Sequence, residues 1–184
     1  MPWFAFAIIL YLRAQHETLA HLGLKRDGLT PHALLVGLVS AVFWVAFNKW
    51  VYLPFISHFF SVPPYTEYDF IRNRLPALIF TILAVWVIGG FYEELVFRGF
   101  IQRVLQGWFV RSRFSFWLAA FVTNILFGLY HWQQGIFGII PSFLGGLLWS
   151  YLFWHYKGNL WYPILSHALY DTIALVMIYY GIPI

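Results

Sequence analysis

Pairs of residues spaced four apart carry the chemistry of this chain, and each pair interrupts an apolar segment. The first pair, Glu94 and Arg98, follows a second acid, Glu93. Residues four apart share one face of a helix, so Glu94 and Arg98 can form an ion pair. Glu93 lies about 100° round the helix and keeps a carboxylate for another purpose. We predict that Glu94 and Arg98 support the helix and that Glu93 is a reactive base; the alternative is an ordinary charged helix end.

The second and third pairs place a histidine on a helix face. Phe127 and His131 are four apart, so the phenyl ring can pack on the imidazole and orient it. His167 and Asp171 have the same spacing, and neither Lys nor Arg follows them in the chain. The alternatives are a histidine at the membrane interface for His131, and a His–Asp hydrogen bond that serves helix association for the third pair.

Together these residue types suit the hydrolysis of an amide. A carboxylate and a neutral imidazole, here Glu93 and His131, can hold a water and take its proton while it attacks a carbonyl. A second imidazole, His167, can stabilise the oxyanion. The absence of cysteine and of a Gly-x-Ser-x-Gly motif excludes a thiol nucleophile and a serine elbow. We expect no cofactor, but Glu93, His131 and His167 are also a plausible zinc ligand set, so a metal-dependent protease remains an alternative.

The composition places these residues in a membrane. Of the 184 residues, 61% are hydrophobic and 10% are charged, against roughly 25% charged in a soluble domain. A soluble protein of this size cannot cover that much apolar surface. Ionisable residues inside a bilayer are costly and are functional candidates by default. The net charge of +4 comes from Lys and Arg in loops, so we expect no nucleic-acid partner.

Apolar segments alternate with loops rich in Gly, Pro and charge. They run over about 3–12, 32–56, 75–97 or beyond, 114–130, 136–153 and 160–180. Helices satisfy their own backbone groups in lipid, so we predict an all-α, polytopic transmembrane bundle of about six helices, in a single domain over 1–184. The first segment is short for a span of ~20 residues and is a partial or interfacial helix unless it continues through His21.

Alternation of the spans puts most basic residues on one side, which the positive-inside rule makes cytoplasmic. This group is Arg13, Lys25, Arg26, Arg103, Arg111, Arg113 and Lys157. One conflict follows. If Arg103 and Arg113 both mark that face, Glu93 lies ~15 Å and His131 ~27 Å from it, so the two would not meet. Either the fourth span starts deeper or is strongly tilted, or a helix boundary is wrong; we expect the motifs to meet, because helix boundaries are the less reliable prediction.

Two further motifs have structural explanations. His16-Glu17-Thr18-Leu19-Ala20-His21 is similar to the zinc-protease motif His-Glu-x-x-His, but its second histidine comes one residue late. The two imidazoles then diverge by ~140° on a helix and cannot chelate together. Gly145-Gly146 are expected to permit close helix packing rather than to bind phosphate.

In chain order, Glu93-Glu94-x-x-x-Arg98, Phe127-x-x-x-His131 and His167-x-x-x-Asp171 resemble the three motifs of the CPBP family, the CAAX-processing and bacteriocin-processing glutamyl intramembrane endopeptidases. The resemblance covers about 75–175, and Phe97-Arg98-Gly99-Phe100 is similar to the bacterial branch. It implies a multi-pass protein of the bacterial inner membrane. By position it implies catalytic roles for Glu93, His131, His167 and Asp171, and supporting roles for Glu94, Arg98 and Phe127.

Many members of that family carry Asn where this chain has Asp171. An ionised Asp accepts hydrogen bonds but cannot donate one to an oxyanion, so Asp171 either orients His167 or is protonated. The resemblance also implies membrane lipids and a membrane-associated or prenylated-like protein or peptide substrate as partners. A hypothesis of another class is a non-catalytic scaffold, immunity protein or transporter that keeps the polar cluster for substrate or proton handling.

Overall fold

The helices follow the apolar segments closely. The computed structural model describes residues 2–63 and 66–182, and every regular element in those ranges is helical. The α-helices are α1 (Pro2–Ala14), α2 (Pro31–Phe47), α3 (Leu53–Ser57), α4 (Leu75–Val85), α5 (Gln102–Trp108), α6 (Ser115–Tyr130), α7 (Ile136–His155) and α8 (Trp161–Tyr179). This confirms the predicted all-α fold.

Two of the long helices contain π-helical stretches. The stretch η1 (Asn48–Tyr52) joins α2 to α3, while η3 (Trp86–Glu93) and η4 (Leu95–Ile101) join α4 to α5. The chain from Leu75 to Trp108 is therefore one continuous helix of 34 residues. π-helical turns are rare and occur often at functional sites; η3 ends at Glu93, and Glu94 lies between η3 and η4.

Local signals explain where α2 begins. Thr30 is extended, and its hydroxyl accepts a hydrogen bond from the Ala33 amide at 3.1 Å. Pro31 follows at the first helical position, where its missing N–H costs nothing. The cap places the start of α2 beside the N-terminal half of α8.

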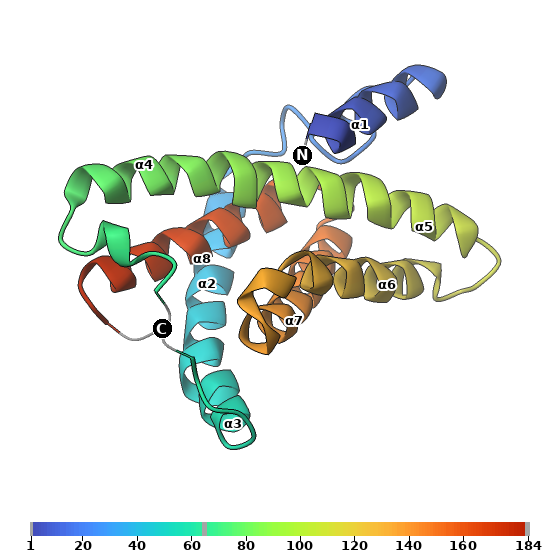
Figure 1. Cartoon of the computed structure of the whole chain (residues 1–184). Coiled ribbons are helices and arrows are strands. Elements are labelled where there is room, and N and C mark those ends of the chain that lie inside the picture. The colour runs from blue at the N-terminus through green and yellow to red at the C-terminus, as the bar shows by residue number, and fades with distance from the viewer. Residues whose placement is uncertain (1, 64–65, 183–184) are drawn as a thin grey trace.

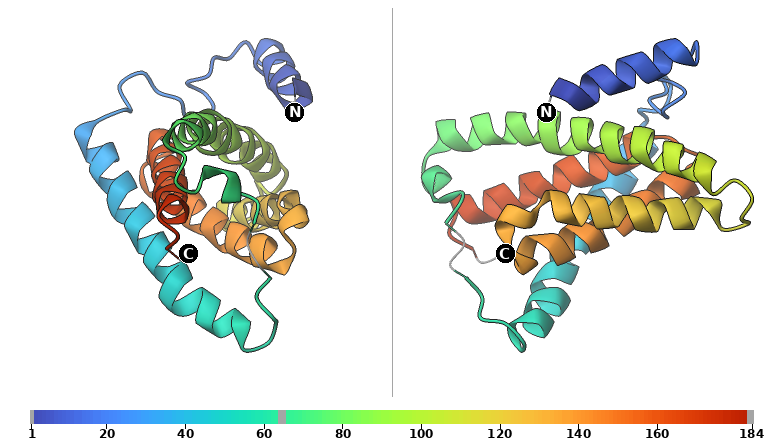
Figure 2. Two further views of the ribbon diagram at one scale, coloured as in Figure 1. Left: turned by 60° about the vertical axis from the view of Figure 1, so that its left-hand side comes forward. Right: turned by 45° about the vertical axis from the view of Figure 1, so that its right-hand side comes forward.

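The helix α8 lies at the centre of the bundle, between α2, α7 and the helix that contains α4 and η3 (Figures 1 and 2). Glycines allow the neighbours to approach closely. A Cβ on Gly90 would lie 2.6 Å from the Ala168 Cβ, and one on Gly37 would lie 2.7 Å from the Leu165 Cβ. This packing buries the N-terminal half of α8, including His167.

The outward faces of the bundle are apolar. Large side chains such as Val39, Phe80 and Phe121 are more than half exposed, which suits a surface solvated by lipid. Three helices are long and apolar enough to cross a membrane: 31–56, 75–108 and 136–155. The protein is an integral membrane protein.

The conflict over depth is resolved by a corrected boundary. Arg103 does not end its helix; its guanidinium lies 5.2 Å from the centre of the Phe153 ring, and the helix continues to Trp108. Glu93 is then fifteen residues before this end, and His131 is sixteen residues after the start of α6 at Ser115. Because α5 and α6 run side by side in opposite directions (Figure 1), the two residues reach similar depth.

Candidate active site

The predicted ion pair on the glutamate helix is present. Arg98 Nη1 lies 3.2 Å from Glu94 Oε1, and both side chains are completely buried. Glu94 Oε1 also lies 2.8 Å from His167 Nδ1 on α8. One oxygen of Glu94 therefore joins the glutamate helix to the central helix, a link that helical spacing could not predict.

Arg98 continues into a chain of buried side chains. Its Nη2 donates to Asn124 Oδ1 on α6 at 2.9 Å, and Asn124 Nδ2 donates to Ser150 Oγ on α7 at 2.9 Å. The Ser150 hydroxyl then donates to Gln102 Oε1 at 2.9 Å. These five side chains, which we call the buried polar network, are all fully buried: Glu94, Arg98, Gln102, Asn124 and Ser150.

The sequence analysis missed three members of this network, Asn124, Ser150 and Gln102. The signal was present, since each is a hydrogen-bonding side chain within or beside an apolar span. The network also needs Gly146, because a Cβ there would overlap Asn124 and lie 2.6 Å from Arg98 Nη2. Gly145 in turn packs against the Trp44 ring, so the predicted packing role of Gly145-Gly146 is confirmed.

His131 directly follows α6, and its ring is held as the spacing predicted. The rings of Phe127 and His131 are 4.8 Å apart at 72°. His131 Nδ1 lies 2.9 Å from the Phe127 carbonyl oxygen, which can only accept a hydrogen bond. Nδ1 therefore carries the proton, and the Nε2 of a neutral His131 is an acceptor. Phe127 also lies under Arg98, whose guanidinium carbon is 4.3 Å from the ring centre.

His167 is held from two directions. The indole of Trp149, a residue that the sequence analysis did not select, stacks on its ring at 3.8 Å and 17°. Its Nδ1 contacts Glu94, while its Nε2 lies 3.7 Å from Asp171 Oδ2. The second distance is that of an ion pair rather than a hydrogen bond, so Glu94 makes the closer contact with His167.

Glu93 and Asp171 meet at the crossing of η3 and α8. A Cβ on Gly89 would lie 2.7 Å from Asp171 Oδ2, so the glycine makes room for the carboxylate. Glu93 is 7% exposed and interacts electrostatically with His167 and Asp171. His131 interacts in the same way with His167. The three motifs therefore converge around His167.

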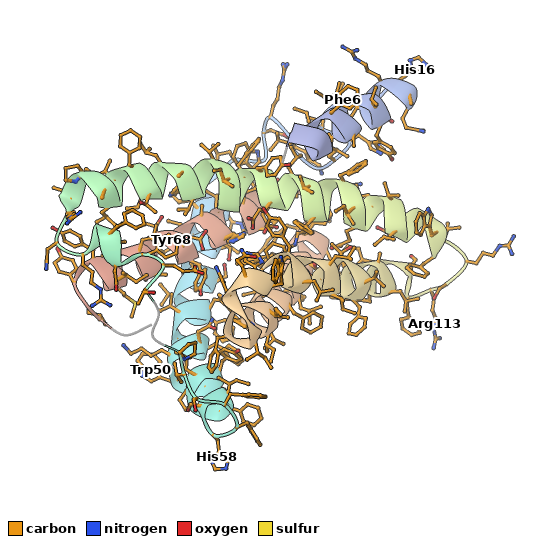
Figure 3. The ribbon with its side chains drawn as sticks, in the orientation of Figure 1. Phe6, His16, Trp50, His58, Tyr68 and Arg113 are labelled. Atoms are coloured by element: carbon orange, nitrogen blue, oxygen red, sulfur yellow. The ribbon has the colours of Figure 1, made fainter. Side chains whose placement is uncertain are left out.

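Tyr68 is a further residue near the carboxylates, and it comes from the loop before α4 (Figure 3). It precedes the short helix η2 (Asp69–Ile71), which is anchored by the fully buried Ile71. Burial raises the pKa of Tyr68, and the charges of Asp171, Glu67 and Glu93 raise the pKa further. The phenol is therefore protonated at neutral pH and can donate a hydrogen bond.

A metal ion in this site would need several of its acid and imidazole side chains as ligands. Within 2–63 and 66–182, no three His, Asp or Glu side chains are close enough to share one ion. A zinc site made of Glu93, His131 and His167 would therefore require their side chains to move together.

The fold and this site define a class: polytopic membrane proteins with acid, base and imidazole groups gathered inside the bundle. The sequence profile of the family described as "Type II CAAX prenyl endopeptidase Rce1-like" matches residues 75–173, which is more than half of the chain. The chain belongs to this family, as its three motifs predicted.

The chain is also similar to individual proteins of known bacteria. An "Uncharacterized 24.3 kDa protein" of Escherichia coli is 30% identical over 77% of this chain and 62% of its own length. "Uncharacterized protein YpbD" of Bacillus subtilis is 27% identical over 70% of this chain and 58% of its own. This chain thus spans less than two thirds of each relative. No solved structure matches it.

Proposed function

We propose that the protein is an intramembrane endopeptidase that cleaves a peptide bond with a water activated by Glu93 and His131. One observation carries the proposal: Glu94 Oε1 is shared between Arg98 and His167. Those contacts balance the charge of Glu94 and give it a structural role. Glu93, one residue earlier and beside His167 and Asp171, is the carboxylate left for proton transfer.

The proposed reaction begins with a water between Glu93 and the Nε2 of His131. The water oxygen attacks the amide carbonyl carbon while its proton passes to Glu93. The resulting oxyanion is stabilised by hydrogen-bond donors in the site. The tetrahedral intermediate then breaks its C–N bond, and the proton held by Glu93 passes to the departing amine.

The oxyanion needs a donor, and most groups in the site are acceptors. Ionised Glu93 and Asp171 only accept, and a neutral His131 presents an acceptor at Nε2. Of the side chains named above, the Nε2–H of a protonated His167 and the hydroxyl of Tyr68 can donate. Tyr68 lies close enough to Asp171 and Glu93 for their charges to act on its phenol, which makes its hydroxyl a candidate donor to the oxyanion.

The substrate follows from the position of the site and from the family. Glu93, His131 and Asp171 lie among apolar helices at the edge of the bundle, so we expect a peptide to enter from the bilayer or its surface. We propose a membrane-associated peptide, with a C-terminal prenylated segment as the first substrate to test because the family profile names prenyl endopeptidases. The expected location is the inner membrane of a bacterium, with several helices crossing it.

The test compares purified wild type with Glu93→Gln in liposomes that contain a fluorogenic prenylated peptide. We expect the rate to fall by about 10²–10⁴-fold, because general-base catalysis contributes that much. Glu17→Gln is the matched control, since this acid is exposed after α1 and pairs with His21. Full activity in a folded Glu93→Gln variant would contradict the proposal.

The same preparations separate the alternatives. Stoichiometric metal, with activity lost on chelation and restored by metal, would favour the metal-dependent protease. A cleaved bond located by mass spectrometry, present with wild type and absent with Glu93→Gln, would exclude a purely non-catalytic scaffold or transporter. A separate proteomic comparison of cells that express wild type with cells that express Glu93→Gln would identify natural substrates.

A further inference from the structure

Two neighbouring hollows lie on the α2 side of the bundle, and they share one residue. The first, of about 330 Å³, is lined by Lys25, His155, Lys157 and Tyr162 among others. The second, of about 520 Å³, follows α2 past Leu35, Val39 and Phe43. Tyr156 lines both hollows. A polar hollow thus continues into an apolar one.

The polar hollow is lined by two lysines and by a pair of stacked tyrosines, and we call the lysine side its positive rim. Lys25 and Lys157 both line it, and its one acid is Asp27. Lys25 Nζ donates to the Lys157 carbonyl oxygen at 3.4 Å, which joins the loop after α1 to the turn before α8. Beneath them the rings of Tyr156 and Tyr162 stack at 3.6 Å and 4°. The Lys25 ammonium is therefore held beside the backbone of Lys157, and the two lysines line one hollow although they are far apart in the sequence.

The apolar hollow follows one face of α2, and we call it the α2 groove. Leu35, Val39 and Phe43 are spaced four apart and share one face of α2, where each is more than half exposed. The groove runs ~12 Å along the helix axis. It begins beside the positive rim and runs away from it along α2, toward the middle of a span.

We propose that the two hollows together bind an anionic glycerophospholipid. Its phosphate lies between Lys25 and Lys157, with His155 at the edge, and one acyl chain lies in the α2 groove. Basic pockets at the ends of membrane helices are suited to acidic headgroups. A soluble phosphate would use only the first hollow, and a zwitterionic lipid would bring the cation of its headgroup next to the two lysines along with its phosphate.

The test measures binding by native mass spectrometry of the delipidated full chain, without any substrate. The probes are phosphatidylglycerol and phosphatidylcholine with identical acyl chains, and inorganic phosphate. We expect at least about tenfold tighter binding of phosphatidylglycerol, and no displacement of it by millimolar phosphate. Equal affinity for the two lipids would overturn the proposal, and displacement by phosphate would reassign the first hollow to a free anion.

Two variants test the residues, and one serves as a control. Lys25→Gln with Lys157→Gln should reduce phosphatidylglycerol binding to the level of phosphatidylcholine. Val39→Gln should weaken both lipids by filling the groove with a polar group. Arg113→Gln removes a basic residue from the distant α5–α6 turn (Figure 3) and should change neither. An unchanged preference in the folded double lysine variant would overturn the proposal.

Discussion

Two regions meet at His167, and they differ in how far their charged groups are buried and paired. The buried polar network holds its members at zero exposure, and its charged pair is neutralised internally. The reactive group, Glu93, His131, Asp171 and Tyr68, lies at the edge of the same bundle and keeps some access. The side chain of Asp171, for example, is 20% exposed.

Because the two regions differ in burial and in charge balance, one helix can carry two adjacent glutamates with different roles. Glu94 is enclosed by Arg98 and His167, and its contacts with them position both neighbours. Glu93 faces the crossing with α8, where proton transfer is open to it. His167 belongs to both regions through its two ring nitrogens. Variants in the network should therefore change stability, and variants in the reactive group should change rate.

The largest effect is expected from Glu94→Gln. Removing this charge leaves the fully buried Arg98 uncompensated, which costs about 3–5 kcal/mol in the free energy of unfolding. His167 also loses the negative charge of its acceptor, so activity should fall as well. Reversible unfolding in detergent measures the first effect. Adding Arg98→Met should recover most of the stability without the activity; failure to recover it would show that the network needs its charges.

The next effect tests whether the network depends on close packing. Gly146→Ala places a methyl group against Asn124 and Arg98, and overpacking costs about 1–3 kcal/mol. Gly107→Ala is the matched control, because no atom lies within 4 Å of its Cβ position. Thermal unfolding of both variants is the measurement. Equal stability of the two would mean that α6 and α7 can separate without cost.

Tyr68→Phe tests the reactive group alone. The variant keeps the ring and removes the hydroxyl, so stability should hold while kcat falls about fivefold, the value of one hydrogen bond of about 1 kcal/mol. The KM should change little if the bond forms to the oxyanion. A rise in KM at constant kcat would instead assign Tyr68 to substrate binding.

The smallest effect is expected from Asp171→Asn. Glu94 already contacts His167 Nδ1 at 2.8 Å, whereas Asp171 Oδ2 lies 3.7 Å from Nε2, beyond hydrogen-bond distance, and Asn keeps an oxygen at that position. We expect kcat within roughly fivefold of wild type, a change of about 1 kcal/mol, measured on the same peptide. A loss of a hundredfold or more would show that the negative charge of Asp171 is required, and would move it from support to the chemical step.

Much of the fold was predictable because it depends on local hydropathy. The described helices end within a few residues of the apolar segments, apart from the helix that runs on through η4 and α5. That error arose at Arg103, whose guanidinium packs over Phe153 and so does not require a loop. A charged residue therefore does not have to mark a helix end when its side chain can pack along neighbouring apolar or aromatic groups.

The sequence by itself determined the contacts that lie within one helix. The Glu94–Arg98 pair and the Phe127–His131 ring contact follow from spacing four apart, since helical geometry brings such residues together whatever surrounds them. Only the tertiary structure decided the rest. The Glu94–His167 contact and the Trp149 stack join different helices, and their partners depend on how glycines let those helices approach. Helical periodicity carries no information about that approach.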